Sequence, residues 1–267
     1  MSIEGPRRAH ISRQGGHQIA ICAVIVRRPD ENHLKGELSR AMLEKWINPI
    51  YLDDRRTSQL RADFEADPVR MLILDDVLLP ERYARISQGL RTDCDWTTHY
   101  GVDASGELTS AERFNATPAD QRLFRHGNYR APKTGRELAP GMLAIVGFKL
   151  LAGRADFRHW LGTLTGIDTG AIADLLVRRM GRDDFSTRHD DRAAERRLCL
   201  LLYFNDDWHP GMGGTFRVFT ARGERVIDPL PNRAILFDVD ADQSHGVDPL
   251  HDVPADWYRY NFTLWLG

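Results

Sequence analysis

The spacing of apolar residues changes along the chain, and each spacing predicts its own kind of element. Over residues 34–65 apolar side chains recur every three to four positions, which predicts helix, and Asn48-Pro49 ends the first helical segment. The apolar run at 71–80 predicts a strand that enters a turn. The first part of the chain is therefore expected to place helices beside at least one strand.

The same pattern predicts the other elements of the first two-thirds of the chain. Pro80 is typical of the first turn of a helix, and it opens an amphipathic helix over 80–90. Residues 102–138 are polar, and a loop of that length is typical of a lid or a mobile binding segment. The remaining expectations are a loose arm over 1–30 with one short strand at "IAICAVIV", a strand at "DWTTHYG", and helices over 139–152, 154–165 and 170–179.

From about residue 185 the pattern becomes a series of short β-rich runs separated by Gly, Pro, Asn and Asp. Several short strands at nearly regular spacing predict a sandwich or a barrel. The six runs are "RLCLLLYFN", "GTFRVFT", "ERVIDPL", "RAILFDV", "SHGVDPL" and "YRYNFTLWL". Helices first and strands afterwards indicate an α+β fold.

Composition narrows the class of protein without naming a function. The 267 residues are 42% hydrophobic and 28% charged, and the net charge of -2 favours neither nucleic acid nor an anionic membrane surface as partner. The sequence contains no apolar run of transmembrane length and no signal-peptide pattern at its start. Its three cysteines form neither a disulfide framework nor a zinc motif, so a reducing cytoplasm is the expected location.

The candidate chemistry begins with His189 and Asp191, which precede the first strand of the β-rich part. Alternate residues of a strand share a face, so an imidazole and a carboxylate point the same way here. Either the pair belongs to a polar edge strand, or it binds a metal ion with a second histidine from a distant strand. His245, followed by Gly246, supplies that histidine, and two histidines with one carboxylate form the facial triad typical of Fe(II).

The order of motifs over the last 80 or so residues resembles the prolyl-4-hydroxylase-like, Fe(II)- and 2-oxoglutarate-dependent oxygenases. The motifs are most similar to those of the hypoxia-sensing prolyl hydroxylases and their bacterial relatives. The pieces that carry the resemblance are His189-Asp190-Asp191, Arg197 through Asn205, Gly213-Gly214, Pro229 to Phe237, His245, and Arg259-Tyr260 with Thr263 and Trp265. The resemblance implies a double-stranded β-helix, or jelly roll, with N-terminal helices packed on one side.

The resemblance also implies one oxygenase domain over residues 1–267 and a set of site residues. Beyond the arm at 1–30, residues 31–180 would form a mainly helical support and lid, and 181–267 the catalytic jelly-roll half. The metal ligands and catalytic residues would be His189, Asp191 and His245, with Fe(II), the co-substrate 2-oxoglutarate and O2 as cofactors. Asp191 distinguishes the chain from the related halogenases, which have Gly or Ala at that position.

The co-substrate residues that the resemblance implies are Arg259, Thr263 and Tyr203. Arg259 would meet the distal carboxylate of 2-oxoglutarate with its planar fork, and the two hydroxyls would add donors. The alternative for Tyr203 and Thr263 is a packing role in their strands. Trp265 is interpreted as a core residue, and Asp190 is expected to point away from the metal.

Three functions follow as hypotheses. The first is oxidation of a small amino-acid-like or natural-product substrate, by hydroxylation or by desaturation or ring closure, with release of succinate and CO2. The second is hydroxylation of a prolyl residue in a protein, and the third is a non-enzymatic jelly-roll binding protein. Four arginines before the metal strand either offer a cation to a substrate carboxylate or form a solvated basic face: Arg178, Arg179, Arg182 and Arg188.

Overall fold

The structure is a computed structural model that describes residues 40–102, 107–130 and 137–267. The strand expected at "IAICAVIV" and the arm over 1–30 lie outside the described residues. The first elements are η1 Pro49–Tyr51, α2 Asp54–Ala66, β1 Met71–Leu74, α3 Pro80–Thr92, β2 Asp95–Gly101, α4 Ala111–Ala116, η2 Ala119–Gln121, β3 Phe124–Arg130, α5 Pro140–Ala152 and α6 Ala155–Thr165. The remaining strands are β4 Ile172–Met180, β5 Phe185–His189, β6 Leu198–Tyr203, β7 Phe216–Thr220, β8 Gly223–Ile227, β9 Ala234–Asp238, β10 Ser244–Val247 and β11 Arg259–Leu266.

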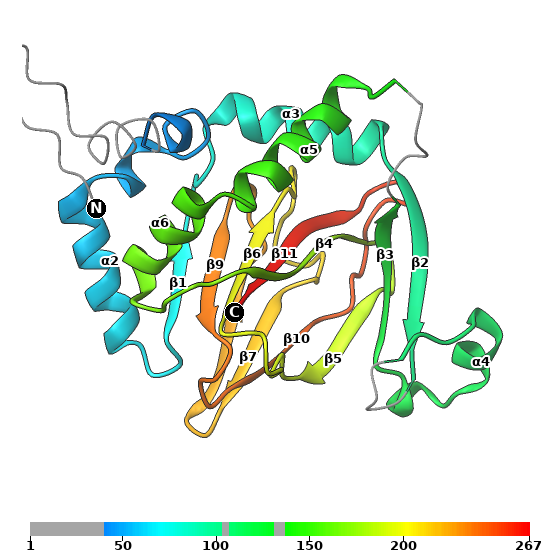
Figure 1. Cartoon of the computed structure of the whole chain (residues 1–267). Coiled ribbons are helices and arrows are strands. Elements are labelled where there is room, and N and C mark those ends of the chain that lie inside the picture. The colour runs from blue at the N-terminus through cyan, green and yellow to red at the C-terminus, as the bar shows by residue number, and fades with distance from the viewer. Residues whose placement is uncertain (1–39, 103–106, 131–136) are drawn as a thin grey trace, which may run out of the picture.

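The strands form one curled antiparallel sheet in the described residues. Its order is β1-β9-β6-β11-β4-β3-β5-β10-β7-β8, with β2 paired to β3. Strand β3 bonds to β4 at Gly127 and Asn128 and to β5 at Phe124 and Arg125. Strand β2 pairs with β3 along its full length, so β4 and β5 share the other edge of β3, each at a different end. The sheet therefore folds back on itself at β3 into a half-barrel (Figure 1). This arrangement confirms the predicted jelly-roll α+β fold.

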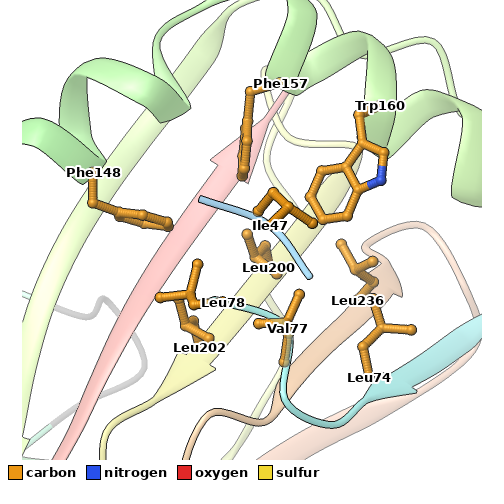
Figure 2. A pocket seen from close by; sticks show the side chains of 11 residues that line it. Ile47, Leu74, Val77, Leu78, Phe148, Phe157, Trp160, Leu200, Leu202 and Leu236 are labelled. Carbon is orange, nitrogen blue, oxygen red and sulfur yellow. The ribbon is translucent and has the colours of Figure 1, made fainter. Parts of the chain in front are cut away.

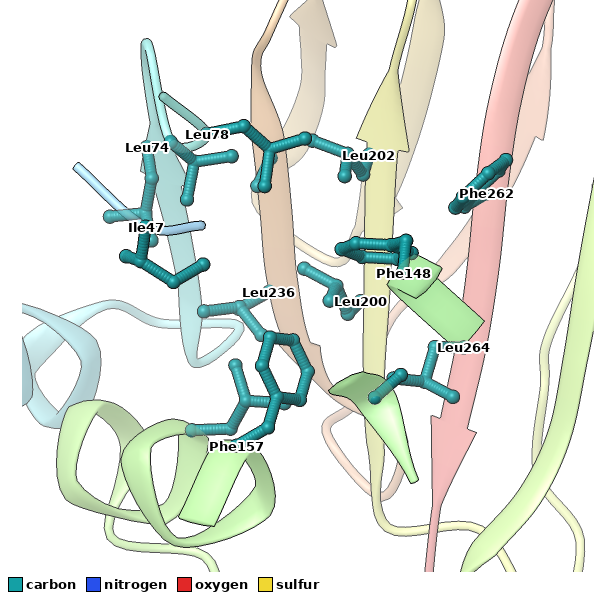
Figure 3. Packing of buried hydrophobic residues seen from close by; sticks show 14 of the residues in the cluster. Ile47, Leu74, Leu78, Phe148, Phe157, Leu200, Leu202, Leu236, Phe262 and Leu264 are labelled. Atoms are coloured by element: carbon teal, nitrogen blue, oxygen red, sulfur yellow. The ribbon is translucent and has the colours of Figure 1, made fainter. Parts of the chain in front are cut away.

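The helices cover the outer face of the longer wall of the barrel. Helices α5 and α6 cross above β6, β9 and β11, and α2 flanks β1 (Figure 1). Phe148 of α5 and Phe157 of α6 point at leucines of the sheet such as Leu200, and all three are buried (Figure 3). Burying each such side chain stabilises the fold by about 1.5–3 kcal/mol, so this layer holds the helices on the sheet.

The helix–sheet layer contains a small apolar gap beneath α5 and α6 (Figure 2). Its volume is about 10 Å³, and every residue around it is apolar, including Trp160, Leu202 and Val77. A space of that size holds about one water at most, and a water needs two to four polar partners. The gap is therefore a packing feature of the core and not a ligand site.

Two predictions for the first part of the chain were wrong. The helix expected over 170–179 is strand β4, which pairs with β11 along almost its full length. Leu, Arg and Met favour helix locally, and the long-range pairing overrides that preference. The polar stretch 102–138 is not one long loop, because it contains α4 and β3. Besides its helices, the segment 31–180 thus contributes strands β1 to β4 to the same sheet.

The other predicted elements were confirmed. Helices α3, α5 and α6 and strands β1 and β2 lie where the pattern places them, and six strands follow residue 185 at the predicted runs. The helical stretch breaks at Asn48, whose side chain accepts a hydrogen bond from the backbone of Ile50 and caps η1. Each of these segments forms its element from local spacing and punctuation.

Candidate metal centre and co-substrate pocket

His189, Asp191 and His245 converge at one end of the half-barrel. His189 ends β5, and its direct cross-strand partner on β10 is His245. His189 Nε2 lies 3.9 Å from Asp191 Oδ1, and His245 Nε2 lies 3.3 Å from Asp191 Oδ2. One ligand atom from each residue falls within 4.8 Å of the others, which is the spacing of a three-residue metal site.

The neighbours of these three residues orient them toward a common point. His189 Nδ1 lies 2.7 Å from the carbonyl oxygen of Thr187, and His245 Nδ1 lies 3.3 Å from Gln243 Oε1. Each Nδ1 donates to an oxygen, so Nε2 of each ring is the free ligand atom. Trp265 Nε1 donates to Asp191 Oδ2 at 3.0 Å and fixes the carboxylate. Trp265 is thus a core residue that also contacts the site, which the sequence interpretation missed.

The electrostatics favour the metal-binding protonation states of His189 and Asp191. Burial, and then the neighbouring His245, lowers the pKa of His189 below its usual value, so its ring is neutral at neutral pH. Burial alone would raise the pKa of Asp191, but the hydrogen bond and the charge of His245 outweigh burial and lower it. A neutral imidazole and an ionised carboxylate are the forms that ligate Fe(II).

Arg259 lies buried deeper in the barrel without a carboxylate partner among the described residues. It is 2% exposed, and its Nε has no hydrogen-bond partner. Its Nη1 donates to Asn261 Oδ1 at 3.1 Å, and Asn261 Nδ2 donates to Thr263 Oγ1 at 2.9 Å. Burial lowers the pKa of the guanidinium. A buried cation without an anion is costly, so this pocket fits a ligand that carries a carboxylate.

Tyr203 and Gly214 shape the space around this guanidinium. The Arg259 Cζ atom lies 4.7 Å from the centre of the Tyr203 ring, and the Tyr203 hydroxyl is buried without a hydrogen-bond partner. Burial raises the pKa of Tyr203 to about 12, so the hydroxyl stays protonated as a donor. A Cβ added at Gly214, whose φ is +70°, would lie 3.1 Å from Arg259 Cδ. Any larger residue at this position would therefore crowd the Arg259 side chain.

The metal candidates lie at the junction of two cavities. The inner cavity has a volume of about 50 Å³ and is lined by Arg259, Asn261 and Thr263 together with all three triad residues. The outer cavity has a volume of about 770 Å³ and also includes His189 and Asp191 in its wall. A metal ion held by the triad would thus face a small closed-in pocket on one side and a large cavity on the other.

The structure brings the six predicted site residues together at one end of the barrel, and their roles as ligands stay predictions. Asp190 Oδ1 accepts a hydrogen bond from the backbone N–H of Arg192, and Asp190 is not part of the three-residue group. The sequence interpretation missed Asn261, which links Arg259 to Thr263. Its signal was the two-residue spacing, because positions 259, 261 and 263 of a strand share one face.

Comparisons with known proteins agree with this geometry. A model of the 2OG-Fe(II) oxygenase superfamily matches residues 175–267, which span β11, the triad and Arg259. This part of the chain belongs to the 2OG-Fe(II) oxygenase superfamily. The superfamily consists of dioxygenases that use Fe(II), 2-oxoglutarate and O2, and the His-Asp-His group and the buried Arg259 of this chain fit the first two.

Two curated relatives share sequence with this chain. The chain is 27% identical over 118 residues to "Prolyl 3-hydroxylase OGFOD1" of Mus musculus, across 42% of this chain and 21% of the mouse protein. It is 30% identical over 99 residues to the protein of that name in Xenopus laevis, across 34% of this chain and 19% of the frog protein. The matches therefore span only about a fifth of the length of these relatives.

Solved structures share the fold of this chain. A prolyl hydroxylase from Trichoplax adhaerens, in complex with a hypoxia inducible factor peptide fragment, matches with a TM-score of 0.56 and 18% identity over 80% of this chain and 89% of that one. A 2OG-Fe(II) oxygenase family oxidoreductase from Burkholderia pseudomallei matches with a TM-score of 0.55 and 16% identity over 79% and 90%. Among the described helices, none combines the length and apolarity that a membrane crossing requires.

Proposed function

We propose that this chain is an Fe(II)- and 2-oxoglutarate-dependent oxygenase that hydroxylates a prolyl residue of a protein or peptide. One observation carries the proposal: the triad lies between a small pocket with an unpaired buried arginine and a cavity of about 770 Å³. Two curated relatives are named prolyl 3-hydroxylases, which supports a prolyl substrate. These names favour the second hypothesis from the sequence over the small-molecule substrate that stood first.

The residues take the following parts in this proposal. His189, Asp191 and His245 hold Fe(II) through two Nε2 atoms and one carboxylate oxygen. Bound together, Fe(II), 2-oxoglutarate and O2 supply the oxidising power that places one oxygen atom on a substrate carbon, with release of succinate and CO2. The protein's own work is to hold these groups and the substrate in place.

The inner pocket binds the distal carboxylate of 2-oxoglutarate through Arg259. Asn261 accepts a hydrogen bond from the guanidinium at 3.1 Å and so fixes the direction of its fork. The Tyr203 ring lies against the guanidinium, and its hydroxyl is available as a further donor. Thr263 Oγ1 already accepts from Asn261, so its own hydrogen remains free to donate to the carboxylate.

The size of the outer cavity supports a substrate larger than an amino acid. Its volume of about 770 Å³ lies in the upper part of the range of about 300–1,000 Å³ that drug-sized ligands occupy. A non-enzymatic binding protein would have no use for a complete facial triad beside an unpaired buried arginine. Both features therefore support catalysis.

The experiment is a screen of product formation against prolyl peptides. The purified protein with Fe(II), 2-oxoglutarate and air is incubated with a panel of proline-containing peptides and, separately, with the free amino acids. We expect succinate formation that rises with certain peptides, together with a mass gain of one oxygen atom on proline. Stimulation by free amino acids alone would contradict the peptide substrate, and no succinate under any condition would contradict the oxygenase.

A further inference from the structure

Three polar side chains in the wall of the outer cavity have buried atoms without hydrogen-bond partners. These atoms are His126 Nδ1, Asn128 Oδ1 and Arg178 Nε. His126 is 7% exposed, and the Asp191 carboxylate is the largest charge that acts on Arg178. The amide nitrogen of Asn128 lies 2.8 Å from His99 Nδ1. The Asn128 Oδ1 atom therefore remains without a partner. Buried polar atoms are rarely left unpaired, so a ligand is expected to supply their partners.

The strand pairing places these groups next to one another and next to the triad. Asn128 of β3 and Arg178 of β4 are direct cross-strand partners, and His126 shares the face of Asn128 because it lies two residues earlier. The guanidinium of Arg178 lies 5.6 Å from the ring centre of Trp265, whose nitrogen holds Asp191. A ligand bound by Asn128 and Arg178 therefore lies beside the metal candidates.

One donor and one acceptor side by side match the C=O before a residue of an extended chain and the N–H after it, because these two groups point to the same side. The Arg178 guanidinium donates to a carbonyl oxygen, and Asn128 Oδ1 accepts from an N–H. A carboxylate has acceptors only, so it would satisfy Arg178 but leave Asn128 Oδ1 without a partner. The pair thus fits the main chain of a peptide better than the carboxylate of a free amino acid.

The cavity continues beyond Asn128, where a longer chain has room. A second hollow of about 450 Å³ shares His99, Asn128 and Leu176 with the outer cavity. Strand β4 pairs with β3 at Arg178 and Arg179 alone, so the same edge at Leu175 to Val177 has no strand partner among the described residues. An extended peptide can therefore pass the triad and leave along β4.

From these contacts we infer that Arg178 and Asn128 bind a main-chain carbonyl and N–H beside the target residue. The two residues then select a residue within a peptide chain over the free amino acid. The inference rests on the proposed function, because it names the substrate group that the outer cavity of the oxygenase takes. Arg178 and Asn128 are positioning residues for substrate in this scheme and do not ligate the metal.

The test measures binding of three small probes to anaerobic enzyme loaded with Fe(II) and 2-oxoglutarate, by calorimetry. The probes are N-acetyl-L-proline N-methylamide, its methyl ester without the N–H, and N-acetyl-L-proline with a free carboxylate. We expect the amide to bind about 2- to 10-fold tighter than the acid, because the amide alone supplies an N–H to Asn128 Oδ1. Arg178→Leu should weaken binding of the amide about 10- to 100-fold, and Arg178→Lys should recover part of the lost affinity.

Asn128→Leu should weaken binding of the amide about 2- to 10-fold, and the amide and the ester should then bind with equal affinity. The matched control is Arg179→Gln, because Arg179 is on the other face of β4, where it stacks on Trp96 and Tyr258. That variant should bind the amide as the wild type does. In each variant, a separate titration with 2-oxoglutarate reports that the protein is folded and its inner pocket intact.

The outcomes separate this inference from the proposed function. Equal or tighter binding of the acid, no saturable binding of the amide, or no effect of both leucine variants would overturn the inference. Loss of 2-oxoglutarate binding in Arg178→Leu would also overturn it, because Arg178 would then serve the co-substrate. Failure of the wild-type enzyme to bind 2-oxoglutarate at all would instead overturn the proposed function.

Discussion

The two cavities that meet at the triad differ in size and in the polar groups they present. The inner cavity of about 50 Å³ is lined by the Arg259 guanidinium, which Asn261 and Thr263 support through a chain of hydrogen bonds. The outer cavity of about 770 Å³ offers donors and acceptors spread over several strands, including Asn128. Arg178 and His126 line both cavities, whereas Arg259 lines the inner one and Asn128 the outer one.

This difference indicates that the two cavities bind different kinds of ligand. A pocket with one buried cation depends on one anionic partner, and any ligand without that charge leaves the cation uncompensated. A larger cavity with dispersed polar groups accepts a ligand through several weaker contacts, each worth about 0.5–1.5 kcal/mol. Substitutions in the inner pocket should therefore have large effects on one ligand, and those in the outer cavity should have smaller effects on another.

The largest effect is expected where both cavities depend on the same residues. His189→Ala, Asp191→Gly or His245→Ala removes one of three metal ligands, so succinate formation should fall to background while the protein stays folded. The measurements are bound iron, succinate and thermal unfolding of each variant. His209→Ala is the control, because that exposed side chain bonds only to its neighbour Pro210 and should leave all three unchanged. Full turnover in any triad variant would show that its residue is not a ligand.

The next largest effect is expected on co-substrate binding in the inner pocket. Arg259→Ala removes a buried cation that lines the inner cavity and not the outer one, and loss of a buried charge partner costs roughly 3–5 kcal/mol. The dissociation constant of 2-oxoglutarate should rise by about 10²- to 10³-fold, whereas iron binding should be nearly unchanged. Arg259→Lys should recover part of the affinity, since it keeps the charge without the fork. An unchanged 2-oxoglutarate titration would place the co-substrate elsewhere.

A smaller effect should separate support of the metal from the metal ligands themselves. Trp265→Phe removes the 3.0 Å hydrogen bond to Asp191 Oδ2 but keeps most of the buried aromatic side chain. Loss of such a supporting partner typically lowers metal affinity about 10- to 100-fold. Iron affinity should fall by that factor, and turnover at saturating iron should largely return. Wild-type iron affinity in this variant would show that Trp265 acts only in the core.

The smallest effect concerns the stability of the outer wall in acid. Burial, and then the positive charge of Arg178, lowers the pKa of His126 well below its usual value, so the folded protein keeps this ring neutral. Below a pH of about 6.5 the unfolded chain binds a proton that the folded state does not, and stability is lost as the pH falls. His126→Phe removes this loss, and the ring can stack on Phe124 as His126 does. The drop in melting temperature from neutral pH to about pH 5 should be a few degrees smaller in the variant; an equal drop would contradict this.

The inner pocket could be predicted from the sequence because its motifs resemble those of a known family, and because Arg259 and Thr263 share one face of their strand. His189 ends β5 and Asp191 lies two residues beyond it, so local chain geometry and not strand pairing brings this carboxylate to the site. The outer wall could not be predicted in this way. His126 and Asn128 lie in a polar stretch that was expected to be a loop, and Arg178 lies in a segment whose residues favour helix. Only the pairing of β4 with β11 and β3 brings these three side chains to the cavity.

The most direct test of the proposed function follows the oxygen atoms in a single reaction. The enzyme with Fe(II), 2-oxoglutarate and a responsive prolyl peptide is supplied with O2 labelled at both atoms, and succinate and peptide are analysed by mass spectrometry. We expect one labelled oxygen in each succinate and one in each hydroxylated proline, with the two products formed in equal amounts. Hydroxylated peptide without label, or peptide oxidation that proceeds without 2-oxoglutarate, would contradict a 2-oxoglutarate-dependent oxygenase acting on proline.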